Sequence, residues 1–170
     1  LQELPASAFS PKAHFRLGEI QFKITRDFDG ARSSYLSALA SRPDKNLQKN
    51  ILLRIGDTFI AAGNLKAARN HFKVQHRKND NTSISPFTMK EIHLIFLTGT
   101  IDTAKTVLDS VIVNALPNDI YFNDLMELQD IIAQNYTFGS ETDKEALVQY
   151  SIAERLLQQD KLVEAAEMLA

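Results

Sequence analysis

The sequence predicts an all-α protein in which antiparallel helix hairpins stack on one another as an α-α superhelix. Apolar residues recur at helical spacing along almost the whole chain, and no segment alternates with period two over the length of a strand. A short turn motif also returns four times. Internal self-similarity of this kind is typical of a repeat architecture.

The first half of the chain contains two expected hairpins. After an irregular lead-in over 1–10, Ser10-Pro11 predicts a helix start, because serine caps helices and proline fits their first position. A turn is predicted at 27–30, before the second helix. The second hairpin breaks at Gly63, and a polar loop without periodicity follows over 79–85.

The second half begins in the same way. Ser85-Pro86 repeats the serine-proline start and opens a third hairpin, whose break is Gly99. A single helix is expected over 119–135. Ser140 and Asp143 then have the spacing of a capping box that starts the last hairpin. The predicted units form a single domain over 11–170: repeats over about 11–44, 46–80 and 85–117, a degenerate helix over 119–135, and a partial repeat over 141–170.

The turn motif consists of a turn residue, a hydrophobic residue two places on, and an alanine three places after that. The hydrophobic residue is expected to dock the turn, and the alanine to let two helices approach closely. The motif members are Phe28 and Ala31 in the first turn, then Gly63, Leu65 and Ala68, then Gly99, Ile101 and Ala104, and finally Asp160, Leu162 and Ala165.

This pattern resembles the tetratricopeptide repeat, a helix pair of about 34 residues. In that family the first helix carries a small residue, a glycine turns the chain, and the second helix carries an alanine and an aromatic residue. The second hairpin matches at Leu52, Ile55, Gly56, Phe59, Gly63, Leu65, Ala68 and Phe72. The first matches at Leu17, Gly18, Ala31, Tyr35, Ala38 and Pro43, with one extra residue in its turn, and the last at Ala153, Leu156, Leu162 and Ala165.

The chain departs from the family pattern in two places. The third hairpin keeps Gly99, Ile101 and Ala104 but has Ile92 where the family has a small residue. The helix over 119–135 has no obvious counterpart in the family. We therefore expect three to four divergent repeats.

The resemblance implies a function in protein binding. Such arrays commonly bind a peptide or protein segment on a concave face lined by the first helix of each pair. We therefore predict a non-catalytic protein-protein interaction module. The candidate residues on that face are Lys12, Phe15, Arg16, Glu19, Lys23, Asn50, Leu53, Arg54, Asp57, Met89, His93, Phe96, Tyr150 and Glu154.

Arg16 and Arg54 occupy equivalent places, as do Glu19 and Asp57. A ladder of arginines could hold a carboxylate-bearing peptide. The interpretation that we favour is plainer: Arg16–Glu19 and Arg54–Asp57 are pairs three residues apart on solvated helix faces. Two further functions stay open, namely an architectural spacer or assembly segment in a longer array, and an accessory domain to a catalytic domain elsewhere in the gene.

Composition excludes several classes of function. With no cysteine in 170 residues, disulfides, thiolate metal sites and cysteine nucleophiles are excluded. The four histidines lack the pairing of a zinc protease, and no glycine-rich phosphate loop or set of acid, base and nucleophile is present, so we expect no enzyme, cofactor or metal.

Other binding partners are also not expected. A net charge of −2 does not favour nucleic acid, and no apolar stretch reaches the roughly 20 residues of a membrane span. The cytoplasm and the periplasm both remain open. Since the sequence does not begin with methionine and ends within an apolar-periodic run, we expect a fragment of a longer chain.

Overall fold

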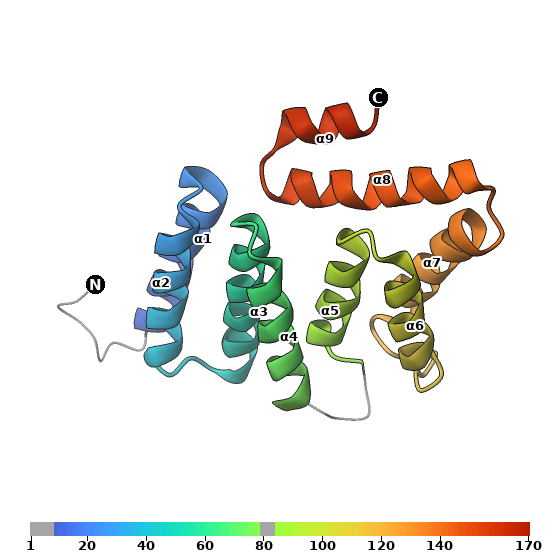
Figure 1. The fold of residues 1–170 in the computed structure, drawn as a ribbon. Coiled ribbons are helices and arrows are strands. Elements are labelled where there is room, and N and C mark those ends of the chain that lie inside the picture. The colour runs from blue at the N-terminus through green and yellow to red at the C-terminus, as the bar shows by residue number, and fades with distance from the viewer. Residues whose placement is uncertain (1–8, 79–83) are drawn as a thin grey trace. The chain divides into compact units, whose positions relative to one another are not determined.

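The computed structural model describes residues 9–78 and 84–170. Within these ranges it contains nine α-helices, two short π-helical segments and no strand (Figure 1). Consecutive helices pack on one another, so the prediction of an all-α chain is confirmed. The structure divides into two compact units, residues 1–71 and 72–170, and each is described by itself. The predicted repeat boundaries remain predictions.

The first unit contains α1 (Ser10–Ile20), η1 (Gln21–Thr25), α2 (Phe28–Ala40), α3 (Lys45–Ala61) and the start of α4 (Leu65–Lys78). In this unit α1 packs on α2, and α2 packs on α3. The buried core residues are Ala31, Tyr35, Ala38, Ile51 and Ile55. A Cβ on Gly18 would lie 2.5 Å from the ring of Tyr35, so the close contact of α1 with α2 depends on this glycine.

The second unit contains the rest of α4 and five further α-helices. They are α5 (Pro86–Leu97), α6 (Ile101–Ile112), α7 (Phe122–Ile132), α8 (Glu141–Gln158) and α9 (Leu162–Met168), with the π-helical segment η2 (Ala133–Thr137) between α7 and α8. α5 packs on α6 and on α8, α6 packs on α7, and α9 lies against α8 (Figure 1). The predicted single helix over 119–135 is thus α7 continued by η2.

The turn motif keeps its predicted spacing and buried alanines, but in the last turn the hydrophobic residue, Leu162, is 60% exposed and does not dock the turn as predicted. In each of the four turns, a residue in the left-handed backbone region, with φ between 56 and 76°, lies just before the second helix: Arg26, Gly63, Gly99 and Asp160. The hydrophobic residue two places on is in every case the first residue of a helix: Phe28, Leu65, Ile101 and Leu162. The four motif alanines are at most 1% exposed: Ala31, Ala68, Ala104 and Ala165.

The predicted turn at 27–30 is placed too late. α2 already begins at Phe28, after Asp27, whose carboxylate accepts a hydrogen bond from the Gly30 N–H at 2.9 Å. The left-handed residue of this turn is Arg26, not a glycine, with φ of 56°. Sequence reasoning missed it because the aspartates and the glycine that follow are the stronger turn signals.

The extra residue of the first hairpin lies in the helix rather than in the turn. Gly18 precedes Arg26 by eight positions, one more than separate Gly56 from Gly63. The insertion coincides with η1, whose wider π-helical turn takes up one additional residue.

The two serine-proline helix starts differ. Ser85 is the N-cap of α5, and its Oγ accepts a hydrogen bond from the Thr88 N–H at 3.2 Å. Ser10, in contrast, is the first residue of α1 rather than its cap, and its Oγ lies 3.4 Å from the Oγ of Ser41. The predicted capping box of α8 is confirmed, since Ser140 and Asp143 bond each other's backbone N–H.

Candidate interaction surface

Most candidate residues of the first unit lie on α1, η1 and α3. We call this surface the α1/α3 face, and define it by Lys12, Arg16, Glu19, Lys23, Asn50, Arg54 and Asp57. Of these, Lys12, Arg16, Lys23 and Asn50 are exposed, and the other three are partly buried. The remaining two candidates are more interior. Phe15 packs its ring against that of Tyr35, with centroids 5.7 Å apart, and Leu53 is partly buried.

Glu19 is the centre of a polar network that joins three helices. Its Oε2 lies 2.6 Å from Lys23 Nζ, and its Oε1 lies 2.9 Å from Arg54 Nε on α3. The hydroxyl of Tyr35, on α2, donates a hydrogen bond to the same Oε1 at 2.7 Å. Arg54 also donates to Asp57 Oδ2 at 3.1 Å. The network therefore fixes α1 relative to α3 and holds Arg54 in one orientation.

The network alters the acidity of its members. Partial burial alone would raise the pKa of the Glu19 carboxyl, but the hydrogen bonds from Lys23 and Tyr35 and the charge of Arg54 outweigh it and lower that pKa. Burial, reinforced by the Glu19 carboxylate, raises the pKa of the Tyr35 hydroxyl well above its ordinary value. For Arg54, burial opposes the charged form, yet Glu19 and Asp57 raise its pKa. All three groups therefore keep their ordinary charge states at neutral pH.

Of the two expected pairs three residues apart, one forms. Arg54 and Asp57 are paired as predicted. Glu19, however, is paired with Lys23 and Arg54 instead of Arg16, because Arg54 on the neighbouring helix reaches the same carboxylate. Within residues 9–78 and 84–170, Arg16 makes no ion pair, and its side chain is exposed.

The α1/α3 face carries four cations and two carboxylates, and the helices that form it are more basic still. α1, η1 and α3 together carry six lysines and arginines against two acidic residues, a formal charge of +4, whereas the whole chain has −2. Composition alone hides this excess. Counting charge helix by helix, on the alternate helices of the predicted hairpins, would have found it.

In the second unit the candidate residues lie on α5 and α8. His93 Nε2 lies 3.2 Å from Glu154 Oε1, which ties the two helices together, and the ring of His93 meets Phe96 edge-on. Tyr150 is exposed on α8, and Met89 is partly buried against the core of this unit.

Phe96 does not reach the surface. It is 3% exposed and lies in the core of the second unit, together with its neighbours on both sides in α5. α5 packs on both α6 and α8, so it has little free surface. Phe96 is therefore not part of any binding surface considered below.

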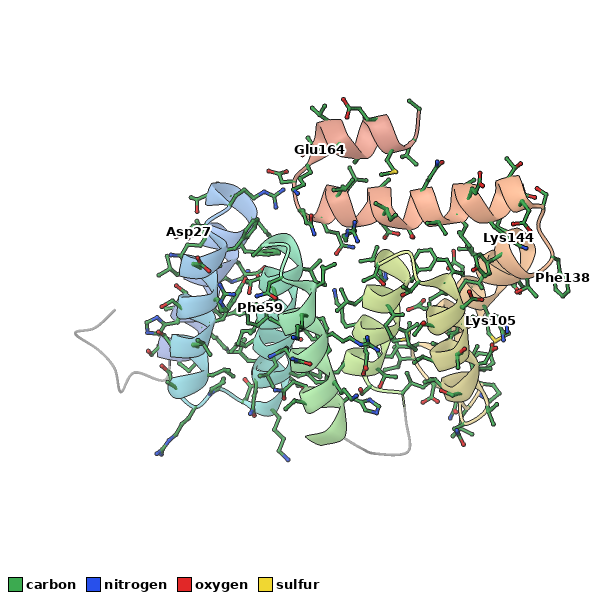
Figure 2. All side chains as sticks on the ribbon, viewed as in Figure 1. Asp27, Phe59, Lys105, Phe138, Lys144 and Glu164 are labelled. Carbon is green, nitrogen blue, oxygen red and sulfur yellow. The ribbon has the colours of Figure 1, made fainter. Side chains whose placement is uncertain are left out.

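The second unit also has a cleft that the sequence analysis did not predict. It has a volume of about 230 Å³ and an apolar floor of Leu108, Ile132 and Ala133. Lys105 and Phe138 are among the residues at its rim, and Figure 2 shows Phe138 pointing away from the helices. Two of the charges that line it are paired, since Lys105 Nζ lies 2.6 Å from the carboxylate of Asp109 and Gln129 donates to the same group. The cleft thus offers an apolar depression, with the exposed carboxylate of Asp130 also in its lining.

Over the described ranges, no group of three or more histidine, cysteine, aspartate or glutamate side chains is placed to hold a metal ion. Over the same ranges, no helix is both long and apolar enough to cross a membrane.

The fold and these surfaces define a class, an all-helical protein of sequentially packed helices with a basic face on one unit. No model of a protein family, no curated protein and no solved structure matches the chain.

Proposed function

We propose that this chain is a non-catalytic protein interaction module, and that the α1/α3 face binds an acidic segment of a partner protein. The observation that carries the proposal is the charge of +4 on α1, η1 and α3. Electrostatic complementarity of this kind speeds encounter and selects partners of opposite charge. The tetratricopeptide-like arrangement inferred from the sequence supports the same function.

The side chains of the face have two different roles in this proposal. Arg54 is held by Glu19 and Asp57, so it presents its remaining donor groups in a fixed orientation. Lys12 and Arg16 are exposed on α1 and make no ion pair within the described residues, so they are available for carboxylates of the partner. Asn50, on α3, adds an exposed amide with donor and acceptor groups.

Fluorescence anisotropy with a labelled peptide rich in glutamate and aspartate tests this proposal. We expect binding that weakens as salt is added, and no binding of a lysine-rich peptide of the same length. The double variant Lys12→Glu and Arg16→Glu should weaken binding by roughly tenfold or more, since a hydrogen bond between charged groups contributes about 1.5–3 kcal/mol.

The matched control is the double variant Lys66→Glu and Arg69→Glu. It reverses two exposed charges in the same unit, on α4 instead of α1. Equal loss of affinity in both double variants would show that only the net charge matters. An absence of binding to the acidic peptide by the unmodified chain would refute the proposal.

A further inference from the structure

One side of α1 and η1 exposes large apolar side chains. Leu17, Ile20 and Ile24 are 37%, 49% and 74% exposed and are separated by three and four positions. This spacing places them on one side of a helix, as in a helix-helix contact. We call them the α1 stripe. Arg16 and Lys23 directly precede two of its members in the sequence and are exposed, so the border of the stripe is basic.

A second apolar surface lies on α9. Leu162, Val163 and Leu169, here called the α9 stripe, are 60%, 68% and 58% exposed. The side of α9 next to this stripe packs on α8, and Ala165, between Leu162 and Leu169 in the sequence, is 1% exposed.

The border of the α9 stripe is acidic. Glu164, labelled in Figure 2, and Glu167 are both exposed on α9, against the single cation Lys161 directly before Leu162. The two stripes are therefore both apolar and exposed, but their borders are opposite in charge.

The charges of the two units extend this complementarity. Residues 1–71 contain eleven lysines and arginines and six acidic residues, a formal charge of +5. Residues 72–170 contain eight lysines and arginines and fifteen acidic residues, a formal charge of −7. Long-range attraction is therefore expected between the first unit of one molecule and the second unit of another, whereas like units repel.

We propose that the chain associates head to tail, with the α1 stripe of one copy packed on the α9 stripe of a second copy. Large exposed apolar surfaces bordered by polar residues are typical of protein-protein contacts. A second copy fits because each exposed apolar stripe finds, on the same chain, another one whose border has the opposite charge. The contact is heterologous, so both stripes of each inner copy are used and the assembly extends beyond two copies unless it closes into a ring.

This association goes beyond the binding of an acidic segment, because it depends on apolar side chains of α1 and η1 that adjoin the α1/α3 face and share only its border residues Arg16 and Lys23. The Leu17, Ile20 and Ile24 side chains carry it, whereas the proposed function depends on Lys12 and Arg16. Variants of the two sets of residues therefore separate the two proposals.

Sedimentation velocity over a wide range of concentration tests the proposal. The unmodified chain should rise above the monomer mass of 19.1 kDa as its concentration increases, and high salt should weaken the association. The double variant Ile20→Glu and Ile24→Glu, and separately Leu162→Glu and Val163→Glu, should each remain monomeric. The control variant Leu36→Glu changes a side chain of similar exposure, 53%, on α2 and should associate like the unmodified chain.

A mixture of the two double variants gives the sharpest result. One variant keeps an intact α9 stripe and the other keeps an intact α1 stripe, so the mixture should form a 1:1 dimer that grows no further. A monomer at all concentrations for the unmodified chain, or association that survives both double variants, would overturn the proposal. Failure of the mixture to form dimers would exclude the head-to-tail contact.

Discussion

The two units use the same turn geometry but fill their cores in different ways. In the first unit, Gly18 lets the ring of Tyr35 pack directly against α1, and the polar side chains of α1 and α3 remain at the surface. In the second unit the equivalent position holds Ile92, which is fully buried. α5 is in contact with both α6 and α8 and is buried along most of its second half.

This difference decides which unit has a usable polar face. Where small residues bring the helices together, the long polar side chains stay outside and can form the network around Glu19. In the second unit a large apolar residue is buried at this position and the helix is enclosed. Phe96, a candidate residue of the binding face, is therefore buried in the core. In this chain, a small residue on the first helix goes with an exposed polar face, and a large buried one goes with an enclosed helix.

The largest expected effect comes from changing that one side chain in each unit. Ile92→Ala should destabilise the protein by about 2–5 kcal/mol, because it leaves a cavity in the core of the second unit. Gly18→Ala should cost about 1–3 kcal/mol, because the new Cβ would meet the fully buried ring of Tyr35, whose hydroxyl is held by Glu19. Urea unfolding of both variants measures these values. A neutral or stabilising Gly18→Ala would contradict the close contact of α1 with α2.

The next largest expected effect is on the free energy of unfolding when the polar network around Glu19 is broken, and this effect depends on pH. Because the pKa of Glu19 is lowered from its ordinary value of 4.5, its contribution to stability is fully present above that value and is lost as the pH falls through the lower pKa of the folded state. Glu19→Gln should therefore cost about 1–2 kcal/mol at neutral pH. The difference from the unmodified chain should shrink as the solution is made acidic.

Thermal melts of the two proteins at a series of pH values check this prediction. Asp29→Asn is the control, because it removes a carboxylate that pairs with Arg32 at the surface, and the Asp29 side chain is 89% exposed. Its effect should be within about 0.5 kcal/mol and nearly independent of pH. A pH-independent difference for Glu19→Gln would show that packing, not charge, is what the substitution removes.

The smallest expected loss of stability comes from substituting the serines of the two serine-proline helix starts. Ser85→Ala should cost about 1 kcal/mol, because it removes the cap of α5. Ser10→Ala should cost less, because Ser10 caps no helix and its contact with Ser41 is long. Denaturant midpoints of the two variants provide the comparison. Equal losses would mean that the two serines have the same role despite their different places in the helix.

Much of the fold could be predicted because the signals are local. Phe28, Leu65, Ile101 and Leu162 each begin a helix, and the alanine three places on is buried each time, as the spacing indicated. The candidate site was harder to predict. Lys12 and Arg16 are exposed, and their place on a binding face stays a prediction. Helical spacing could not show that Glu19 would pair with Arg54, because that pairing depends on the distance between two helices.

The sequence by itself determined the helices, the register of their turns, and the charges that each helix carries. These follow from apolar spacing, from caps and from composition, which act over a few residues. Tertiary structure alone decided that the extra residue of the first hairpin becomes the π-helical segment η1, that α5 is enclosed, and that the charges fall into units of +5 and −7. The physical reason is that these outcomes depend on contacts between helices that are distant in the chain. Several helix packings are compatible with the same local sequence pattern, and the size of one side chain or the reach of one guanidinium selects among them.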